Sequence, residues 1–260
     1  MQSSDLFRLD GKVAIVTGGT SRYGAPIVRA LAGVGATVIF TSRDADKCKE
    51  AAQRLRREGL KAHGETLDLR SETGIRAVRD RIMGKYERVD VLFNNAVERA
   101  GAELRQTTAV EWETSAKVNS TGLFLACQIF SEPMQVQRSG SIINIASIYG
   151  MVGPDFSIYE GTNMTNLISY AFEKGGMISL TRYLASSLGP YGVRVNCLSP
   201  GGFETEGMPE DFKRRYRLRT PLGRMACEDD IKGPAIFLAS DASRYVTGQN
   251  IPVDGGWTAI

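Results

Sequence analysis

Residues Lys12–Gly33 read KVAIVTGGTSRYGAPIVRALAG, and the class of fold follows from this stretch. Lys12–Thr17 is an apolar, β-branched run typical of a buried strand, and Ala25–Gly33 predicts the helix after it. Between them, Thr17–Gly24 forms a glycine-containing turn. Such a turn, leading from a strand into a helix N-terminus, presents backbone N–H groups and the positive end of the helix dipole to a pyrophosphate. On these residues alone, a tight turn that binds nothing remains the alternative.

Short apolar runs continue to alternate with longer amphipathic stretches along the 260 residues. This alternation predicts one α/β domain over residues 1–260, a Rossmann-type doubly wound parallel sheet of about seven strands with helices on both faces. The further strands are expected at Thr37–Thr41, Lys61–Leu67, Val89–Asn94, Ser141–Ala146, Val193–Ser199 and Asn250–Val253, and the further helices near Ala45–Arg57, Glu72–Lys85, Val110–Gln135 and Tyr170–Leu188.

Two stretches interrupt the alternation. A polar segment occupies about residues 148–169, and a loop with a basic helical piece occupies about residues 201–219. Long connections inside compact domains usually serve as lids or binding loops. We therefore expect a substrate-side insertion and a substrate lid at these two places.

The composition excludes several classes of protein. A formal net charge of +3 predicts neither a nucleic-acid partner nor a membrane-seeking surface, and no apolar run is long enough to span a bilayer. The first residues, MQSSDLFRLDGK, lack the apolar core of a secretory signal. Four scattered cysteines without a C-x-x-C pair indicate reduced thiols, and the single histidine, His63, indicates no metal site. We expect a soluble, cytoplasmic protein.

Tyr170 and Lys174 stand four residues apart, which places both side chains on one face of the predicted helix. An ammonium beside a phenol favours the phenolate, which gives a proton donor and acceptor usable near neutral pH. This pairing occurs by chance in many helices.

Ser147 follows a predicted strand and should lie at the carboxyl end of the sheet, where its hydroxyl can donate to a substrate carbonyl oxygen. No G-x-S-x-G pattern or partner histidine marks Ser147 as a nucleophile.

Together these features resemble the short-chain dehydrogenase/reductases, over essentially the whole chain. The resemblance rests on the turn Thr17–Gly24, which is similar to the family pattern T-G-x-x-x-G-x-G, and on motifs in the family's order: Asp68, Asn94-Asn95-Ala96, Asn119, Ser147, Tyr170 with Lys174, Pro200-Gly201 with Thr205, and the closing segment YVTGQNIPVDGGW at Tyr245–Trp257. It implies an oxidoreductase that interconverts a secondary alcohol and a carbonyl with NADP or NAD.

The resemblance also implies the catalytic roles. In reduction, hydride passes from the dinucleotide to the carbonyl carbon while Tyr170 donates a proton and Ser147 holds the oxygen. Lys174 bonds the nicotinamide ribose, and Asn119 kinks the long helix and holds a water that connects Lys174 to solvent. From the residues alone, an asparagine inside a helix that bonds backbone is the alternative for Asn119.

The cofactor contacts that the resemblance implies are numerous: Gly18, Thr20, Ser21, Arg22, Tyr23, Gly24, Ser42, Arg43, Asp68, Leu69, Asn95, Ala96, Val97, Tyr170, Lys174, Pro200, Gly201, Phe203 and Thr205. Ser42 and Arg43 stand where an acidic residue would take the ribose hydroxyls, so a guanidinium is free to pair with a 2′-phosphate. We expect NADP(H) to be favoured, with NAD(H) still open because Asp44 partly cancels the field of Arg43.

Two residues depart from the family pattern. Arg22 replaces the middle glycine of the turn, and Val97 replaces the glycine of N-N-A-G. Glycine at such places permits close approach of the backbone to a ligand, so a Cβ there forces the backbone or the cofactor to shift. These departures keep open a catalytically weak dinucleotide-binding scaffold as an alternative.

The substrate is predicted from the 22 residues between Ser147 and Tyr170, which is a longer segment than the family usually has. Its many hydrogen-bonding side chains favour a small keto-sugar, polyol or sugar acid held by Ser147, Tyr159, Glu160 and Tyr170. A solvent-facing insertion or a subunit contact is the alternative for the segment, and a 3-oxoacyl reductase is the alternative for the enzyme. The basic run Lys213–Arg219 is either a carboxylate- or phosphate-binding patch or a solvated helix face.

Self-association is also expected. Gly175 and Gly176 lie inside the predicted Tyr170 helix, where close helix–helix approach is a natural reason for glycine. The family commonly forms dimers and tetramers through its two longest helices, so the resemblance implies a homo-oligomer, most simply a homotetramer.

Overall fold

In the computed structural model, which describes residues 2–260, one parallel sheet carries the fold, with strand order β3-β2-β1-β4-β5-β6-β7. The strands are β1 Val13–Val16, β2 Thr37–Ser42, β3 Ala62–Thr66, β4 Val91–Asn94, β5 Gly140–Ile145, β6 Val193–Pro200 and β7 Asn250–Val253. The order reverses between β1 and β4, which creates the crevice where doubly wound sheets bind ligands. The expected Rossmann-type sheet is confirmed.

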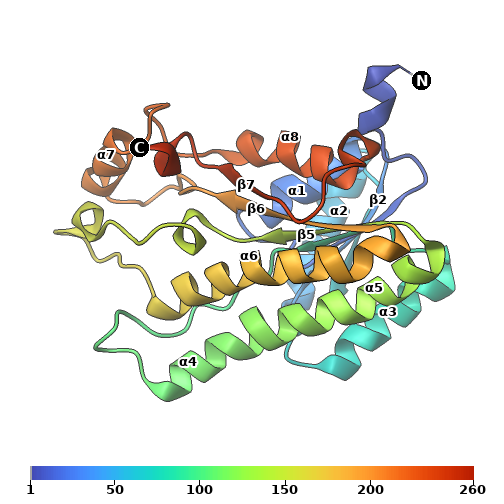
Figure 1. The fold of residues 1–260 in the computed structure, drawn as a ribbon, viewed down its shortest axis with the longest axis horizontal. Coiled ribbons are helices and arrows are strands. Elements are labelled where there is room, and N and C mark those ends of the chain that lie inside the picture. The colour runs from blue at the N-terminus through green and yellow to red at the C-terminus, as the bar shows by residue number, and fades with distance from the viewer. Residues whose placement is uncertain (1) are drawn as a thin grey trace.

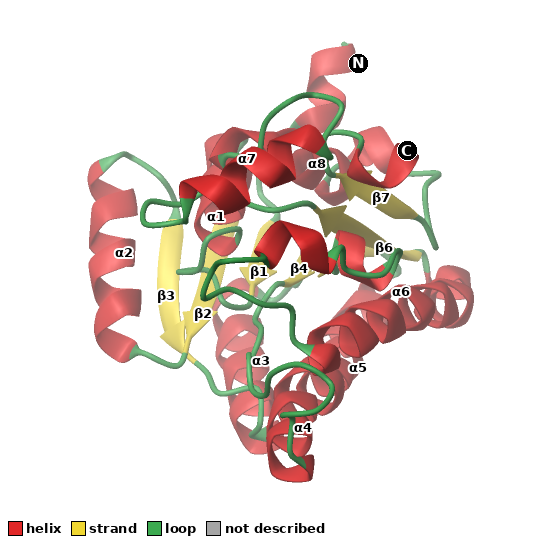
Figure 2. Cartoon of the chain, turned by 90° about the vertical axis from the view of Figure 1, so that its left-hand side faces the viewer, coloured by secondary structure: helices red, strands yellow, loops and turns green. Residues whose placement is uncertain are grey.

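Helices cover both faces of this sheet (Figures 1 and 2). They are α1 Gly24–Gly33, α2 Ala45–Arg57, α3 Glu72–Tyr86, α4 Ala109–Ala116, α5 Leu123–Gln137, α6 Ile168–Leu188, α7 Glu210–Leu218 and α8 Glu228–Ala239. Apolar residues of α3, α5 and α6 form one core layer, and those of α1, α2 and α8 form the other. Val13 and Ile15 face the first layer while Ala14 and Val16 face the second, which explains a strand that is apolar throughout.

Most element boundaries lie within two residues of the sequence expectations, with two differences. The long helix expected over Val110–Gln135 is three pieces, because the π-helical turn Lys117–Gly122 separates α4 from α5. The helix α8 was not expected from sequence, since Gly233 and Pro234 interrupt its helical pattern. The acidic residues Glu228–Asp230 ahead of an apolar run were the available signal, because acidic side chains stabilise a helix N-terminus.

A third, smaller apolar cluster joins the insertion to the lid. It contains Ile148, Ile158, Phe212, Tyr216, Met225 and Trp257. Both segments lie beyond the carboxyl ends of the strands, on the left of Figure 1. Within residues 2–260, no helix is long and apolar enough to cross a bilayer, and no group of three or more His, Cys, Asp or Glu side chains is placed to hold a metal ion.

Candidate active site

A cavity of about 440 Å³ opens at the carboxyl ends of the strands. Its lining comes from the turn after β1, the loops after β4, β5 and β6, the insertion, the start of α6 and the lid. Ser147, Tyr170 and Lys174 all line it, although they come from two elements. The structure therefore brings the three predicted catalytic side chains to one space.

Lys174 is anchored beneath this cavity. It is only 4% exposed, its Nζ donates to the carbonyl oxygen of Ile145 at 2.5 Å, and it lies 5.5 Å from the centre of the Tyr170 ring. Burial lowers the pKa of Lys174, while the nearby Tyr170 and Glu173 act in the opposite direction. Ser147, extended after β5, accepts a hydrogen bond on Oγ from the backbone of Tyr149 at 3.2 Å, so its own proton is free to point into the cavity.

Asn119 lies in the π-helical turn and holds neighbouring segments together. Its amide exchanges two 2.8 Å hydrogen bonds with the backbone of Glu98 and donates to Glu173 Oε2 at 2.5 Å. The long helix therefore loses its regular α-helical pattern at Asn119. The side chain bonds backbone, as in the alternative stated for it, and its amide hydrogens are taken up by protein acceptors.

Glu173 is a buried carboxyl that sequence reasoning missed. It is 5% exposed, and its Oε2 accepts from Asn119 and, at 3.0 Å, from the hydroxyl of Ser115. Burial raises the pKa of Glu173, and the two hydrogen bonds act against that effect. Its position directly before Lys174, on the face of α6 turned toward α4, was the signal in the sequence.

The strand-to-helix turn is tightly packed. A Cβ on Gly24 would lie 2.2 Å from the carbonyl oxygen of Gly18, and one on Gly18, where φ is +64°, would lie 2.8 Å from Ala96 Cα. Asn95 Nδ2 donates to the carbonyl oxygens of Thr17 and Gly18 at 3.0 and 2.9 Å, so it ties the turn to β4. Ser21 Oγ accepts from the N–H of Gly24 at 3.3 Å, and the N–H of Ser21 donates to the carbonyl oxygen of Gly18. Among the described residues, the N–H groups of Arg22 and Tyr23 have no such partner and are left for an anion. The geometry fits a pyrophosphate.

The two departures from the family pattern are accommodated. Arg22 and Val97 are exposed and both line the cavity. Neither has a positive φ, so no left-handed conformation requires glycine at either place. Thr20, in contrast, lines a separate hollow between α1 and α2.

On the adenosine side, the charged residues are paired with one another. Arg43 lies outside the cavity and forms an ion pair with Glu98 at 2.6 Å. The side chain and the backbone N–H of Arg70 both donate to the carboxylate of Asp68, which lowers the pKa of Asp68. Ser71 caps α3. Ser42 Oγ accepts from the backbone of Asp44, and Leu69 is buried.

The loop after β6 is fixed against the turn after β1. Tyr23 donates its hydroxyl proton to the carbonyl oxygen of Gly201 at 2.8 Å, and its ring meets that of Phe203 edge-on at 5.2 Å. Pro200, Gly201 and Phe203 line the cavity, whereas Thr205 does not. Tyr216 closes this side, because its hydroxyl accepts from the backbone of Gly202.

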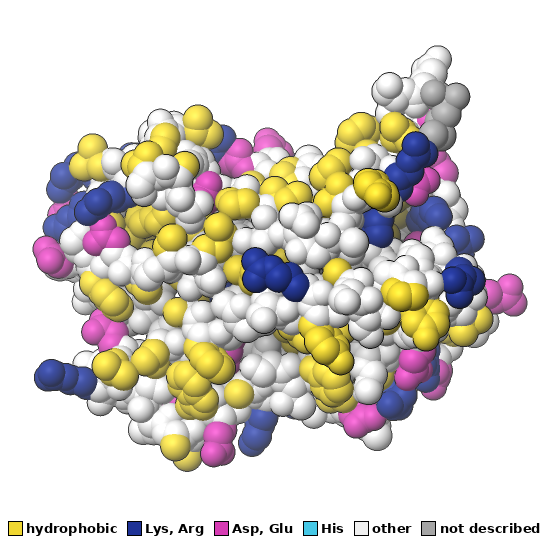
Figure 3. Space-filling view, viewed as in Figure 1, with side chains coloured by type: hydrophobic (Ala, Val, Ile, Leu, Met, Phe, Trp, Pro, Cys, Tyr) yellow, Lys and Arg dark blue, Asp and Glu magenta, His cyan; other side chains and the backbone are white. Residues whose placement is uncertain are grey.

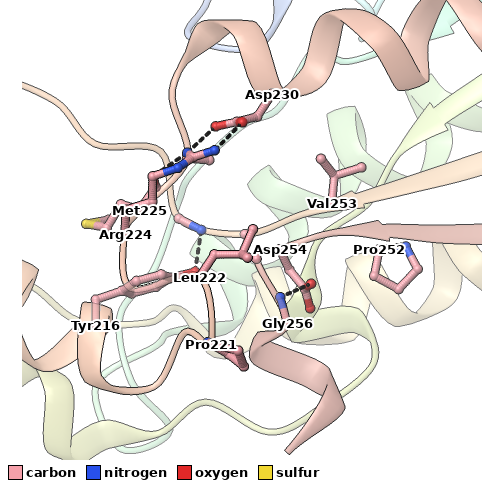
Figure 4. A pocket seen from close by; sticks show the side chains of 14 residues that line it. Tyr216, Pro221, Leu222, Arg224, Met225, Asp230, Pro252, Val253, Asp254 and Gly256 are labelled. Carbon is pink, nitrogen blue, oxygen red and sulfur yellow. Dashed lines mark hydrogen bonds and ion pairs between the residues drawn. The ribbon is translucent and has the colours of Figure 1, made fainter.

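A separate hollow of about 480 Å³ lies next to Tyr216 and the loop after β6 (Figure 4). Two of its charged residues, Arg224 and Asp230, form an ion pair at 2.6 Å, and the third, Asp254, accepts from the backbone of Gly256 at 3.0 Å. Ser147, Tyr170 and Lys174 are not part of its lining. The hollow in Figure 4 therefore adjoins the cavity that these three side chains line, and shares Gly201, Gly202, Tyr216 and Met225 with it.

The substrate wall differs from the sequence expectation at one residue. Glu160 is exposed and does not line the cavity, because its segment turns outward, with its carbonyl oxygen bonded by Arg215. The wall also contains apolar side chains, since Met164 of the insertion joins Met208 and Phe212 there. These apolar residues are present in the wall because the insertion packs on α7 through them.

Polar side chains also line this wall. The hydroxyls of Tyr149 and Tyr159 lie 2.9 Å apart, so Tyr159 faces the cavity as expected. Arg99, which sequence reasoning missed, also lines it, with its guanidinium 5.2 Å from the centre of the Tyr170 ring. The basic run of α7 is largely paired, with Arg217 and Lys213 contacting Glu204 and Glu210.

A doubly wound sheet that places a serine, a tyrosine and a lysine beside an anion-binding turn defines a dinucleotide-dependent oxidoreductase. A family model described as enoyl-(acyl carrier protein) reductase matches residues 21–258. The chain therefore belongs to the short-chain dehydrogenase/reductase family, whose members act on alcohol or carbonyl groups with NAD(P).

Individual relatives cover almost the full chain. The 3-oxoacyl-[acyl-carrier-protein] reductase of Aquifex aeolicus is 34% identical over 253 residues, covering 96% of this chain and 98% of its own. The probable galactose dehydrogenase of Rhizobium meliloti is 36% identical over 262 residues, covering 98% of each. The crystal structure of a gluconate 5-dehydrogenase from Burkholderia cenocepacia in complex with NADP and tartrate matches with a TM-score of 0.91, 33% identity and 100% coverage of both chains.

Proposed function

We propose that the protein is an NADP(H)-linked oxidoreductase for a small, hydroxylated carbonyl compound such as a keto-sugar, or for the matching polyol or sugar acid. The observation that carries this proposal is the convergence of Ser147, Tyr170 and Lys174 on one cavity. A single domain over residues 1–260, with the insertion at about 148–169 and the lid at about 201–219 forming the substrate side, is part of the same proposal.

In the proposed reaction, a bound nicotinamide supplies or accepts the hydride. Tyr170 transfers a proton to the substrate oxygen in reduction, and Ser147 donates a hydrogen bond to that oxygen as its charge develops. Lys174, held by Ile145, keeps a positive charge beneath Tyr170 and thereby favours the phenolate left after proton transfer. Asn119 would hold the π-helical turn that follows α4, the helix that contacts α6.

The residues that would hold the cofactor fit NADP(H). The N–H groups of Arg22 and Tyr23, with the Arg22 guanidinium, would hold the pyrophosphate, and Arg43 would hold the 2′-phosphate. Asp68 and Leu69 would flank the adenine, and Pro200–Phe203 the nicotinamide. The gluconate 5-dehydrogenase relative with bound NADP supports this preference.

The substrate class rests on the polar groups of the wall. Arg99 is a cation at the cavity surface beside Tyr170, which suits a carboxylate on the substrate. A second candidate, a 3-oxoacyl reductase, is favoured by the apolar contacts of Met164, Met208 and Phe212 and by the Aquifex aeolicus relative.

The test is a parallel screen of tetritols, pentitols, hexonates, matching keto acids and an acetoacetyl thioester with NADP(H) and NAD(H). Following reduced-nicotinamide absorbance, we expect the highest kcat/KM with a hydroxylated substrate and NADP(H). A thioester preference would establish the second candidate. Dinucleotide binding without turnover of any probe would instead indicate the catalytically weak scaffold.

We also propose a homo-oligomer formed through the face of α4–α6. Val110, Phe124, Phe172 and Tyr183 are exposed there, between 48% and 72%, and Figure 3 shows apolar side chains on its lower part. Such a patch is more typical of an interface than of a monomer surface. Sedimentation should give a dimer or tetramer, and Phe172→Lys should shift it toward monomer.

Free cysteines, three of them buried, support a cytoplasmic location, which cell fractionation would check.

A further inference from the structure

Glu173 is a buried carboxyl to which the proposed reaction gives no role. Its Oε2 accepts from Asn119 Nδ2 at 2.5 Å and from the hydroxyl of Ser115 at 3.0 Å. These hydrogen bonds join α6 to α4 and to the π-helical turn, where the helices contact one another. Burying a carboxyl costs free energy that an apolar side chain would not cost, so we expect a role beyond packing.

The carboxyl determines which way the amide of Asn119 points. An ionised carboxyl only accepts hydrogen bonds, so it takes the NH2 end of the amide. The oxygen end is thereby directed to Glu98, whose N–H donates to Asn119 Oδ1 at 2.8 Å. The same amide donates to the carbonyl oxygen of Glu98 at 2.8 Å. One side chain therefore holds both backbone polar groups of Glu98.

Asn119 is the anchor of the loop Val97–Arg99, which follows β4. Within residues 2–260, this loop forms no backbone–backbone hydrogen bond, and the N–H of Arg99 donates to the carboxylate of Glu98 inside the loop itself. The backbone of the loop is thus bonded to the rest of the described chain through the amide of Asn119. A loop with so few hydrogen bonds takes its position from its anchor.

The loop carries groups on both sides of the proposed site. Val97 and Arg99 line the catalytic cavity, and the guanidinium of Arg99 lies 5.2 Å from the centre of the Tyr170 ring. Between them, the carboxylate of Glu98 forms an ion pair with Arg43. A shift of this loop would therefore move groups that face the dinucleotide and groups that face the substrate.

We propose that Glu173 is a positioning residue, which acts through Asn119 to hold the loop Val97–Arg99 in the conformation that binds dinucleotide and substrate. The proposal rests on the proposed function, because it takes the cavity beside this loop as the site of both ligands. The reacting side chains are held by other bonds, such as that from Lys174 to the carbonyl oxygen of Ile145. Glu173 should therefore affect binding more than the chemical step.

Three variants separate the acceptor from the charge. Glu173→Gln keeps an acceptor in place and removes the charge, Glu173→Asp keeps the charge and withdraws the acceptor by one methylene, and Glu173→Ala removes both. Glu113→Ala is the matched control, because Glu113 is an exposed glutamate of α4 that does not line the cavity. Circular dichroism shows which variants are folded, and if Glu173→Ala is not, the glutamine and aspartate variants decide.

The first readout is hydrogen–deuterium exchange of the ligand-free proteins, followed by mass spectrometry of peptides that contain Glu98. The N–H of Glu98 is bonded to Asn119, so we expect it to exchange about 10-fold faster in Glu173→Ala and Glu173→Asp. Glu173→Gln and Glu113→Ala should exchange as wild type does. Unchanged exchange at Glu98, or an equal increase in the core strand β1, would overturn the proposal.

The second readout is binding, measured by fluorescence titration with NADPH and by kinetics with the best substrate of the screen. In Glu173→Ala and Glu173→Asp we expect the dissociation constant and KM to rise about 5–20-fold, with kcat changed less than about 3-fold. Glu173→Gln as impaired as Glu173→Ala, or a loss mainly in kcat, would overturn the proposal in favour of an effect of the charge on Lys174. Reduced stability in urea with unchanged binding would overturn it in favour of a structural role alone.

The proposal and the proposed function fail in different ways. If wild type turns over no probe, the NADPH titration and the exchange at Glu98 still decide the role of Glu173. If wild type binds no dinucleotide, the proposed function and the ligand-binding role of the loop are both overturned, whereas the exchange still reports whether Glu173 holds the loop. An active wild type with unchanged exchange and binding in Glu173→Ala and Glu173→Asp would overturn the proposal alone.

Discussion

The ammonium of Lys174 donates to the carbonyl oxygen of Ile145 at 2.5 Å, which ties helix α6 to the end of strand β5. Ser147 follows that strand end by two residues, and Tyr170 lies one helical turn before Lys174. This hydrogen bond therefore ties Tyr170 and Lys174, on α6, to the segment that carries Ser147.

Tyr170→Phe removes only the transferable proton. We expect kcat to fall about 100–10,000-fold, because positioned acid–base groups contribute rate factors of that size. The dissociation constant for NADPH, measured by fluorescence titration, should change less than about 3-fold, since the ring and Lys174 remain. Activity within a few-fold of wild type would show that another group transfers the proton.

Glu173→Ala and Glu173→Gln separate the hydrogen bonds that this buried carboxyl accepts from its ability to ionise. Alanine leaves Asn119 and Ser115 without their shared acceptor, so we expect a loss of about 1–3 kcal/mol in unfolding free energy. Glutamine keeps an acceptor oxygen and should cost less than about 1 kcal/mol at neutral pH. Equal losses in urea denaturation would show that the hydrogen bonds to Glu173 contribute nothing measurable.

The difference in unfolding free energy between wild type and Glu173→Gln should change with pH in a defined direction. Because burial raises the pKa of Glu173, its contribution to stability is fully present below the ordinary glutamate pKa of about 4.3 and is lost as pH rises through the higher folded-state pKa. Glu173→Gln lacks this titration. The unfolding free energy of wild type relative to this variant should therefore decrease from about pH 4.3 toward neutrality, and a rise over that range would contradict the assignment.

In the proposed cofactor site, the carboxylate of Glu98 and the 2′-phosphate of NADP would compete for the guanidinium of Arg43. Arg43→Gln should weaken NADP binding by about 10-fold and NAD binding by less than about 3-fold, because only NADP carries the 2′-phosphate. Glu98→Gln frees Arg43 and should strengthen NADP binding several-fold. Parallel changes for both dinucleotides would place Arg43 outside the cofactor site.

Arg99→Gln tests the cation beside Tyr170. For hexonates and keto acids we expect KM to rise about 10-fold, with smaller changes for the matching neutral polyols, because only the acids lose an ionic partner. Raising the ionic strength should reduce the wild-type preference for acids in the same direction. A similar KM change for acids and polyols would argue against a carboxylate contact.

Much of this protein was determined by local sequence. Continuous apolar strands such as Val13–Val16 must be buried on both faces, and alternating strands and helices allow few topologies, so the doubly wound sheet followed directly. The helical spacing of Tyr170 and Lys174 also placed them on one face without any tertiary information. Helix α8 was not predicted because Gly233 and Pro234 weaken the local helical pattern. Its packing on α1 outweighs the helix propensity that these two residues lose.

Only the tertiary structure decided which side chains face the cavity. Glu160 and Asn166 are six residues apart in one polar segment, yet the first turns to solvent and the second is buried with an unpaired oxygen. Likewise, the pairing of Glu173 with Asn119 and of Arg43 with Glu98 joins residues 54 and 55 positions apart. Sequence patterns report the period of an element, whereas these contacts depend on how the insertion, lid and helices pack together, which no local spacing encodes.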